Sequence, residues 1–253
     1  MNGEKSFRLF LGWTRSIILC AGLIFLVACS GTKPDIKIMA AASLSDAFIE
    51  ISEAFEAKTG LTTSIYTAGS STLATQISEG AQANVVALAN EETMQRVVNS
   101  GQGMNDQEIQ IFATNHLVLV TPPGNPASIS SIENIDGKKI AVCAPVVPCG
   151  SLAYSLAIQE GIELAPSTIE PNVRSVRTKV ELGEVDAGLI YITDVTDGTE
   201  VIDTPRLKTA KTKYPITVLK PVESAAEKFV DFVMSETGQA ILGSYGFGTV
   251  YED

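Results

Sequence analysis

The sequence predicts an α/β fold whose strands are mostly parallel. Short apolar segments alternate with amphipathic segments from residue 36 to residue 244, and glycines such as Gly60 and Gly161 separate them. Residues 85–88 are apolar throughout, which is typical of a parallel strand covered by helices on both faces. Apolar residues make up 45% of the chain, which is enough for a sizeable hydrophobic core.

The predicted elements follow one another along the chain. The strands are expected at residues 36–40, 61–66, 85–88, 117–120, 139–142, 187–192 and 215–219. The helices are expected at residues 43–58, 70–79, 149–159, 173–182, 223–234 and 237–244. In the first helix Phe48, Ile51 and Phe55 recur every three or four residues, which is the period of one helical face. Ser43 is its expected N-cap and Gly60 its expected end.

The N-terminus has the pattern of an export signal. Lys5, Arg8 and Arg15 precede an apolar run at residues 17–29, which is shorter than the about 20 residues that span a bilayer. The run ends in Leu-Val-Ala-Cys, which resembles the lipobox of bacterial lipoproteins. We therefore expect a signal peptide at residues 1–28, lipid attachment at Cys29 and a tether at residues 29–35. This places the chain outside the cytoplasm on the cell membrane. An ordinary signal peptide and an uncleaved signal anchor are the alternatives.

The charge of the chain limits its partners. Cleavage after residue 28 removes three of the 18 basic and one of the 29 acidic residues, so the net charge changes from −11 to −13. Nucleic acids and anionic lipid surfaces attract Lys-rich and Arg-rich chains, so neither suits this chain as a partner. If the ligand is an anion, local dipoles must attract it, because the net charge repels it.

Two cysteines remain after Cys20 in the signal and Cys29 at the lipid site. We expect Cys143 and Cys149 to form a disulfide, because conditions outside the cytoplasm are oxidising and the prolines between the two bend the chain. Two free thiols are an alternative. A metal site is a weaker one, since no His or acidic residue lies nearby.

Four strand-to-helix turns are candidate anion contacts. They lie at residues 40–44, 68–72, 148–151 and 171–174. A helix N-terminus has unpaired N–H groups and a partial positive charge, so several of them together can bind an anion without Lys or Arg. In open α/β sheets ligands bind where strands end and helices begin. The hydroxyls of Ser43, Ser70 and Tyr191 would add donors, although a serine at such a turn is also a common N-cap.

Six short motifs occur in a fixed order along the chain. They are Ala-Ala-Ala-Ser-Leu at 40–44, Gly-Ser-Ser-Thr-Leu-Ala at 69–74, Val-Pro-Cys-Gly at 147–150, Asn-Val-Arg at 172–174, Gly-Leu-Ile-Tyr at 188–191 and Tyr-Gly-Phe at 245–247. In this order they resemble the periplasmic molybdate-binding protein family (ModA type). Each motif alone is weak, and the resemblance spans nearly the whole chain after the signal.

The resemblance implies the type II periplasmic binding protein fold, in which two α/β lobes joined by two crossing strands bind a ligand in the cleft. Lobe 1 would comprise residues 36–117 and 216–253, and lobe 2 residues 118–215. The crossings would lie near residues 116–120 and 214–219. The family's ligand contacts correspond to Ser43, Ser70, Cys149, Val173 and Tyr191. Cys149 and Val173 would act through their backbone N–H groups.

Two positions depart from the family pattern. Asn84 and Asn90 stand where the family usually has Asp. We expect both residues to pack and cap near the cleft rather than to bind the ligand.

The resemblance implies a monomeric protein that captures molybdate, and tungstate with it, and delivers the anion to a separate ABC permease and ATPase. No Walker-type GxxxxGK[ST] motif occurs in the chain itself. No cofactor is implied, and molybdenum would be bound only as its oxyanion, without a direct bond from protein to metal. Another small oxyanion such as sulfate or thiosulfate is the main alternative. A lipid-anchored hydrolase using Cys149 is a remote one, because the single histidine, His116, is expected at a crossing and not beside a nucleophile.

Overall fold

The computed structural model describes residues 33–102 and 108–249. The described residues from Pro34 onward belong to one compact unit. The predicted signal peptide, the lipid site at Cys29 and most of the tether therefore lie outside the described residues. Within the described ranges no helix combines the length and the apolar character that crossing a bilayer requires.

The described chain alternates strands and helices, as the sequence predicts. The strands are β1 (Ile36–Ala41), β2 (Thr63–Ala68), β3 (Val85–Ala87), β4 (Gln110–Thr121), β5 (Ile140–Cys143), β6 (Thr168–Glu170), β7 (Ala187–Tyr191), β8 (Glu200–Ile202), β9 (Lys211–Val218) and β10 (Gly248–Thr249). The α-helices are α2 (Ser45–Thr59), α3 (Ser70–Ser78), α4 (Glu91–Asn99), α5 (Pro148–Glu160), α6 (Val173–Glu181), α7 (Ser224–Met234) and α8 (Glu236–Ser244). The 3₁₀ turns are η2 (Ala42–Leu44), η4 (Ile132–Asn134), η5 (Ile192–Asp194) and η6 (Pro205–Thr209).

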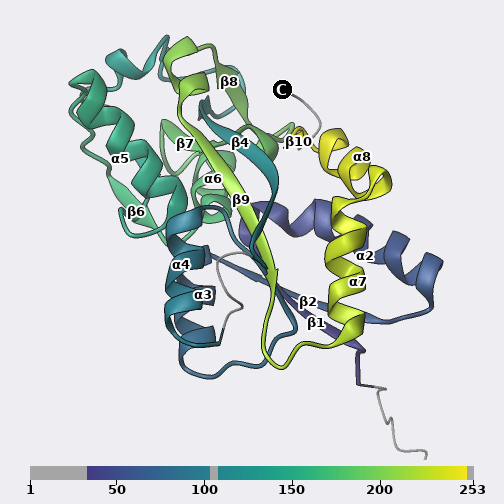
Figure 1. Ribbon diagram of the computed structural model, residues 1–253. Coiled ribbons are helices and arrows are strands. Elements are labelled where there is room, and N and C mark those ends of the chain that lie inside the picture. Colours follow the sequence, from purple (N-terminus) through teal and green to yellow (C-terminus); the bar gives the residue numbers. More distant parts are fainter. Residues whose placement is uncertain (1–32, 103–107, 250–253) are drawn as a thin grey trace, which may run out of the picture. The chain divides into compact units, whose positions relative to one another are not determined.

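These strands form one mixed sheet in the order β2-β1-β3-β9-β4-β7-β5-β6, with β8 and β10 also paired to β4. β1 is parallel to β2 and β3, and β5 is parallel to β6 and β7. The central strands β4 and β9 are antiparallel to their neighbours (Figure 1). The prediction of parallel strands is thus confirmed for both ends of the sheet and wrong for its centre.

Strand β4 connects the two halves of the sheet. It pairs with β9 up to His116 and with β7 from Leu117 onward. We call the half that contains β1–β3 lobe 1 and the half that contains β5–β7 lobe 2. The residue boundaries given above for the two lobes stay a prediction.

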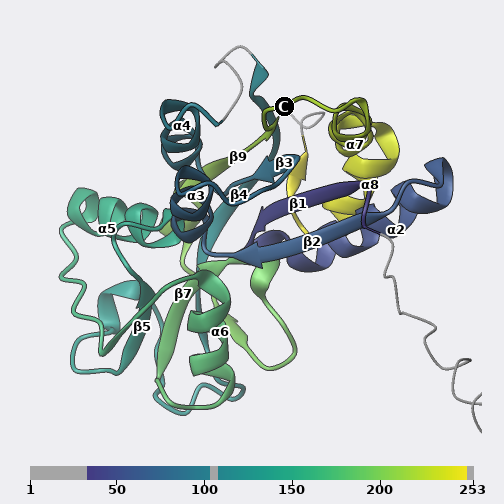
Figure 2. The same ribbon diagram turned by 90° about the horizontal axis from the view of Figure 1, so that it is seen from below.

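Separate hydrophobic cores stabilise the two lobes. In lobe 1 alternate residues of β1 face opposite sides, so Ile38 packs with α2, α7 and α8 while Met39 packs with α3 and α4. Figure 2 shows these two groups of helices on opposite sides of the strands. In lobe 2 the buried residues of β4, β5, β7, α5 and α6 form a single core.

The structure tests several predictions about individual residues and elements. Gly60 ends α2 with a left-handed φ of 72°, as expected. Asn90 caps α4 by accepting a hydrogen bond from the N–H of Thr93, next to Ala89, which lines the cavity described below. Asn84 accepts a hydrogen bond from the N–H of Lys37 at the start of β1, so its predicted place near the cleft is wrong. Helix α4 and the short strands β6, β8 and β10 are absent from the prediction. The strands have only two or three residues, too few to show a period. Helix α4 does bury one face, with Met94 and Val97, and the prediction overlooked it.

The predicted N-cap role of Ser43 is wrong. Helix α2 begins two residues later, at Ser45, after the 3₁₀ turn η2, and no side chain caps it. The hydroxyl of Ser43 instead forms a hydrogen bond with Tyr214, far along the chain. A tertiary contact therefore takes the place of the local one.

We expect Gly188→Ala to lower the free energy of unfolding by about 1–3 kcal/mol, the usual cost of overpacking. An added methyl group would lie 2.8 Å from side-chain atoms of Val176 and Val180, where α6 packs on β7. Urea unfolding followed by circular dichroism measures the change. Gly243→Ala is the control, since the nearest atom would be 3.6 Å away and alanine favours helix, so its stability should stay equal or rise. Equal stability of Gly188→Ala and the wild type would contradict this packing.

Candidate functional site

A small cavity lies where the four predicted turns meet. Its lining residues are Ala41, Ala42, Ser43, Gly69, Ser70, Ala89, Val147, Pro148, Cys149, Asn172, Val173 and Tyr191. The volume open to the centre of a water-sized molecule is about 20 Å³. A single water needs roughly 10–15 Å³ on that measure, so in this conformation the cavity suits a very small ligand.

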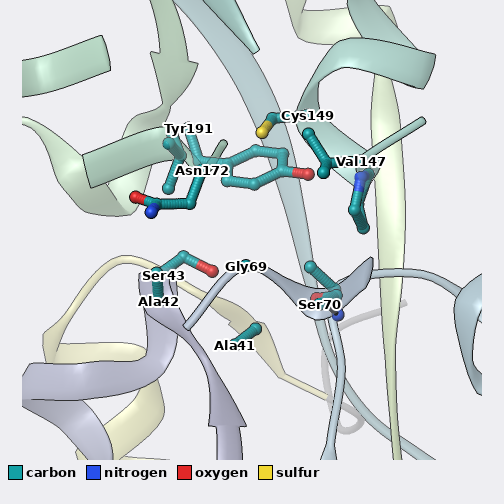
Figure 3. A pocket seen from close by; sticks show the side chains of 12 residues that line it. Ala41, Ala42, Ser43, Gly69, Ser70, Val147, Cys149, Asn172 and Tyr191 are labelled. Carbon is teal, nitrogen blue, oxygen red and sulfur yellow. Dashed lines mark hydrogen bonds between the residues drawn. The ribbon is translucent and has the colours of Figure 1, made fainter. Parts of the chain in front are cut away.

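All five predicted contact residues, from both lobes, line this one cavity. Figure 3 shows Ser43 and Ser70 on one side of it and Tyr191 and Cys149 on the other. The hydroxyl oxygens of Ser43 and Tyr191 point into the space between the two sides (Figure 3). That each of the five contacts the ligand stays a prediction.

The two serines are almost fully buried and each has a defined partner. Ser43 Oγ lies 2.8 Å from the hydroxyl oxygen of Tyr214 on β9. Ser70 Oγ accepts a hydrogen bond of 3.0 Å from the backbone N–H of Ala89. Because a hydroxyl that accepts still has its own proton to donate, Ser70 remains a donor toward the cavity.

Tyr191 ends strand β7 and contributes the third hydroxyl. Its side chain is 1% exposed, and its hydroxyl has no hydrogen-bond partner among the described residues. Burial, together with nearby Tyr214 and Asp194, raises its pKa well above the ordinary value, so the phenol keeps its proton. A buried hydroxyl without a partner costs about 1–3 kcal/mol, and a ligand oxygen in the cavity would remove that cost.

Two helix N-termini face the cavity from lobe 2. Pro148 opens α5, and its fixed φ and missing N–H suit a first helical position, so the next free donor is the N–H of Cys149. Asn172 caps α6 by accepting from the N–H of Ser175, which leaves the N–H of Val173 unpaired within the helix. Both helices also direct the positive ends of their dipoles toward the cavity.

The turn before α5 is tightly built. Cys143 at the end of β5 and Cys149 at the start of α5 form a disulfide. A side chain at position 150 would collide with the backbone oxygen of Ala144, so only glycine fits there. In the structure Cys149 thus has no free thiol, and the turn that presents its N–H has little room to move.

None of the cavity-lining residues has a charged side chain. Arg174 follows the cavity-lining Val173, and its Nε is 3.6 Å from the buried carboxylate of Asp194. Burial raises the pKa of Asp194 to about 7, against the lowering effect of Arg174 and Arg177. Any anion in the cavity would therefore be held by neutral donors and dipoles.

Three contacts join the lobes around the cavity. Arg174 on α6 forms a two-pronged ion pair with Asp46 on α2, with Nη2–Oδ2 at 2.5 Å. The hydroxyl of Ser71 donates to the carbonyl oxygen of Val146, at 2.6 Å. The backbone of Gly69 lies directly against Pro171. A ligand in the cavity would therefore be enclosed by both lobes.

Sequence reasoning missed the partners that lie behind the site. Ala89, which donates to Ser70, follows a short strand and carries no polar side chain that would mark it. Tyr214 and Asn115 lie on the two central strands, and their hydrogen bonds link them to each other and to Ser43 and Thr193. The alternating polar residues within these strands were the one available signal.

The two-lobed fold and a donor-lined cavity between the lobes define a solute-binding protein. The family model described as bacterial extracellular solute-binding protein matches residues 36–248. The molybdate-binding protein ModA of Mycobacterium tuberculosis (strain H37Rv) is 36% identical over 252 residues, covering 92% of this chain and 95% of the relative. The chain belongs to the bacterial extracellular solute-binding protein family and, within it, to the ModA-type members.

Two further comparisons agree with this. A protein of Bacillus subtilis (strain 168) described as the ABC transporter substrate-binding lipoprotein YvgL is 28% identical, over 96% of this chain and 98% of the relative. A solved structure from Clostridium difficile, described as the substrate-binding domain of a molybdenum ABC transporter, is 26% identical with a TM-score of 0.63, covering 85% of this chain and 98% of that one. The predicted fold class is confirmed, and the chain is a solute-binding protein rather than a hydrolase.

We expect Gly69→Ala to separate the lobes without unfolding them. The φ of Gly69 is −59°, which any residue adopts, but an added methyl group would collide with the carbonyl oxygen of Pro171. Small-angle scattering should give a larger radius of gyration for this variant than for the wild type. Thr72→Ala, an exposed position on the same helix, is the control and should keep the wild-type value. Identical scattering from Gly69→Ala would show that the lobes do not meet at this glycine in solution.

Proposed function

We propose that this chain captures molybdate, and tungstate with it, outside the cytoplasm and delivers the anion to a separate ABC permease and its ATPase. The observation that carries the proposal is the cavity itself. Hydroxyls and helix N-termini supply its donors, and its lining contains no charged side chain. The proposed contacts are the hydroxyls of Ser43, Ser70 and Tyr191 and the backbone N–H groups of Cys149 and Val173.

Donors of this kind select anions according to their protonation state. An oxyanion that has lost all its protons accepts at every oxygen, whereas hydrogen phosphate also presents an O–H that needs an acceptor. A cavity lined mainly by donors offers this O–H few acceptors, and leaving it unpaired costs about 1–3 kcal/mol. Molybdate, tungstate and sulfate meet the requirement at neutral pH, and hydrogen phosphate does not.

The relatives support molybdate among the remaining anions. The 36% identical protein of M. tuberculosis is named as a molybdate-binding protein, and the C. difficile structure as part of a molybdenum transporter. Sulfate is the competing ligand, since its charge and shape are the same and only its size differs. The chain would act as a monomer, with the two lobes closing on one anion.

We expect calorimetric titration of the purified chain without residues 1–28 to give dissociation constants for molybdate and tungstate below about 10 μM, or roughly −7 kcal/mol. Phosphate at pH 7 should bind at least about tenfold more weakly, the effect of one unpaired buried group. Sulfate is titrated in parallel. Tighter binding of sulfate than of molybdate would assign the chain to another oxyanion, and equal binding of phosphate would disprove the donor-only cavity.

We further propose that Cys29 carries a lipid anchor. The Leu-Val-Ala-Cys sequence at the end of the apolar run supports it, and YvgL, a relative over nearly the whole chain, is described as a lipoprotein. A membrane-held binding protein stays near the permease that it serves, which raises its local concentration there.

The anchor predicts a change in location when the cysteine is replaced. In a bacterial host with lipoprotein processing, the wild type should sediment with membranes and incorporate labelled palmitate. Cys29→Ala should lose the label, because it has no thiol to modify. Cys20→Ala, which alters a cysteine within the apolar run, is the control and should remain labelled. A labelled Cys29→Ala protein would exclude this site of attachment.

A further inference from the structure

We propose that Tyr214, oriented by Asn115, fixes the hydroxyl of Ser43 as a hydrogen-bond donor toward the ligand. The two residues would then be positioning residues that set the specificity of the cavity, although neither lines it. The inference rests on the proposed function, in which the ligand is a small oxyanion free of protons. It follows from the order of three hydrogen bonds behind the cavity.

The first bond in this order has a defined direction. The side-chain oxygen of Asn115 accepts from the backbone N–H of His116 at 2.9 Å, which fixes the orientation of the amide. Its nitrogen therefore faces the hydroxyl oxygens of Thr193, at 2.8 Å, and Tyr214, at 3.3 Å. An amide nitrogen carries two protons and accepts none, so Asn115 donates to both hydroxyls.

The direction of the second bond follows from burial. Tyr214 is 0% exposed, with its ring packed edge-on against Phe112, Tyr191 and Phe247. Burial raises the pKa of Tyr214 far above its ordinary value, so the hydroxyl keeps its proton. Since Asn115 cannot accept this proton, Ser43 Oγ at 2.8 Å is its acceptor among the described contacts. The opposite direction would leave a buried phenol proton unpaired.

The consequence falls on Ser43. Its oxygen accepts from Tyr214, and its own proton has no other acceptor among the described residues, so it is left for a ligand oxygen in the cavity. Ser70 reaches the same state by a different route, because the backbone N–H of Ala89 can only donate to it. The main chain thus fixes Ser70 as a donor toward the cavity. For Ser43 the same role depends on side chains, which can be changed by mutation.

These hydrogen bonds also connect the two lobes that form the cavity with the central strands of the sheet. Asn115 lies on β4 and Tyr214 on β9, the two antiparallel central strands. Ser43 belongs to lobe 1, and Thr193 follows Tyr191 in lobe 2. The group that orients the Ser43 proton therefore lies on the two central strands of the sheet, between the lobes.

The test compares two anions in Tyr214→Phe. Without the phenol proton, Ser43 is free to accept from a protonated anion. We expect molybdate to bind about fivefold more weakly, the effect of one hydrogen bond, while hydrogen phosphate binds equally well or better. The ratio of the phosphate to the molybdate dissociation constant should fall by about fivefold or more. Calorimetry or competition against labelled molybdate measures both constants.

Three further variants distinguish a change in anion specificity from a general loss of binding. Tyr245→Phe removes the same hydroxyl at a site where it bonds to Glu50, and should leave the ratio unchanged. Asn115→Asp keeps the shape but replaces the donor by an acceptor, so the Tyr214 proton turns away from Ser43 and the ratio should fall as in Tyr214→Phe. In a Ser43→Ala background, Tyr214→Phe should change the ratio no further.

The outcomes distinguish this inference from the proposed function. Binding of an oxyanion by the wild type decides the proposed function, and if sulfate is that anion, the ratio is taken against sulfate. A wild type that binds no oxyanion overturns both proposals. A variant that weakens both anions equally, or that shifts the ratio even without Ser43, overturns the role of Tyr214 while the proposed function stands.

Discussion

A site that binds an anion without a positively charged side chain must offer hydrogen-bond donors whose protons have no other acceptor. This requirement determines how the site is built. Each unpaired buried donor costs about 1–3 kcal/mol, so such groups must be few and must converge. Helix N-termini supply them at no further cost, because their first N–H groups have no partner within the helix. The α/β order along the chain places three helix starts, those of α3, α5 and α6, beside one cavity.

Charge is kept beside the cavity rather than in it. Arg174 is paired with Asp46 in lobe 1 and lies close to Asp194 in lobe 2, so its positive charge is largely compensated. An uncompensated arginine would attract any anion, protonated or not, and would reduce discrimination. Neutral donors act only over hydrogen-bond distances, and for this reason a chain with a net charge of −11 can still bind an anion.

The sequence predicted what depends on local pattern. The strand-to-helix turns placed Ser43, Ser70 and Cys149 at one cavity, because apolar period and turn residues mark where elements begin. It missed the contact between Ser43 and Tyr214, which are 171 residues apart. This contact depends on strand β3, which pairs both with β1, the strand before Ser43, and with β9, the strand that carries Tyr214. The same cause explains the wrong N-cap, since Ser43 has a tertiary partner instead of a local one.

Protonation alone does not separate molybdate from sulfate, so size must do so. A cavity can discriminate between anions by size only if its donors are held in place and cannot move inward to contact a smaller anion. The disulfide between Cys143 and Cys149 and the backbone contact at Gly150 restrict the turn before α5, and Asn172 restricts the start of α6. On the opposite side, the bond from Ala89 holds Ser70 in place. Donors fixed from both lobes would thus allow a small neutral cavity to distinguish anions of equal charge and shape.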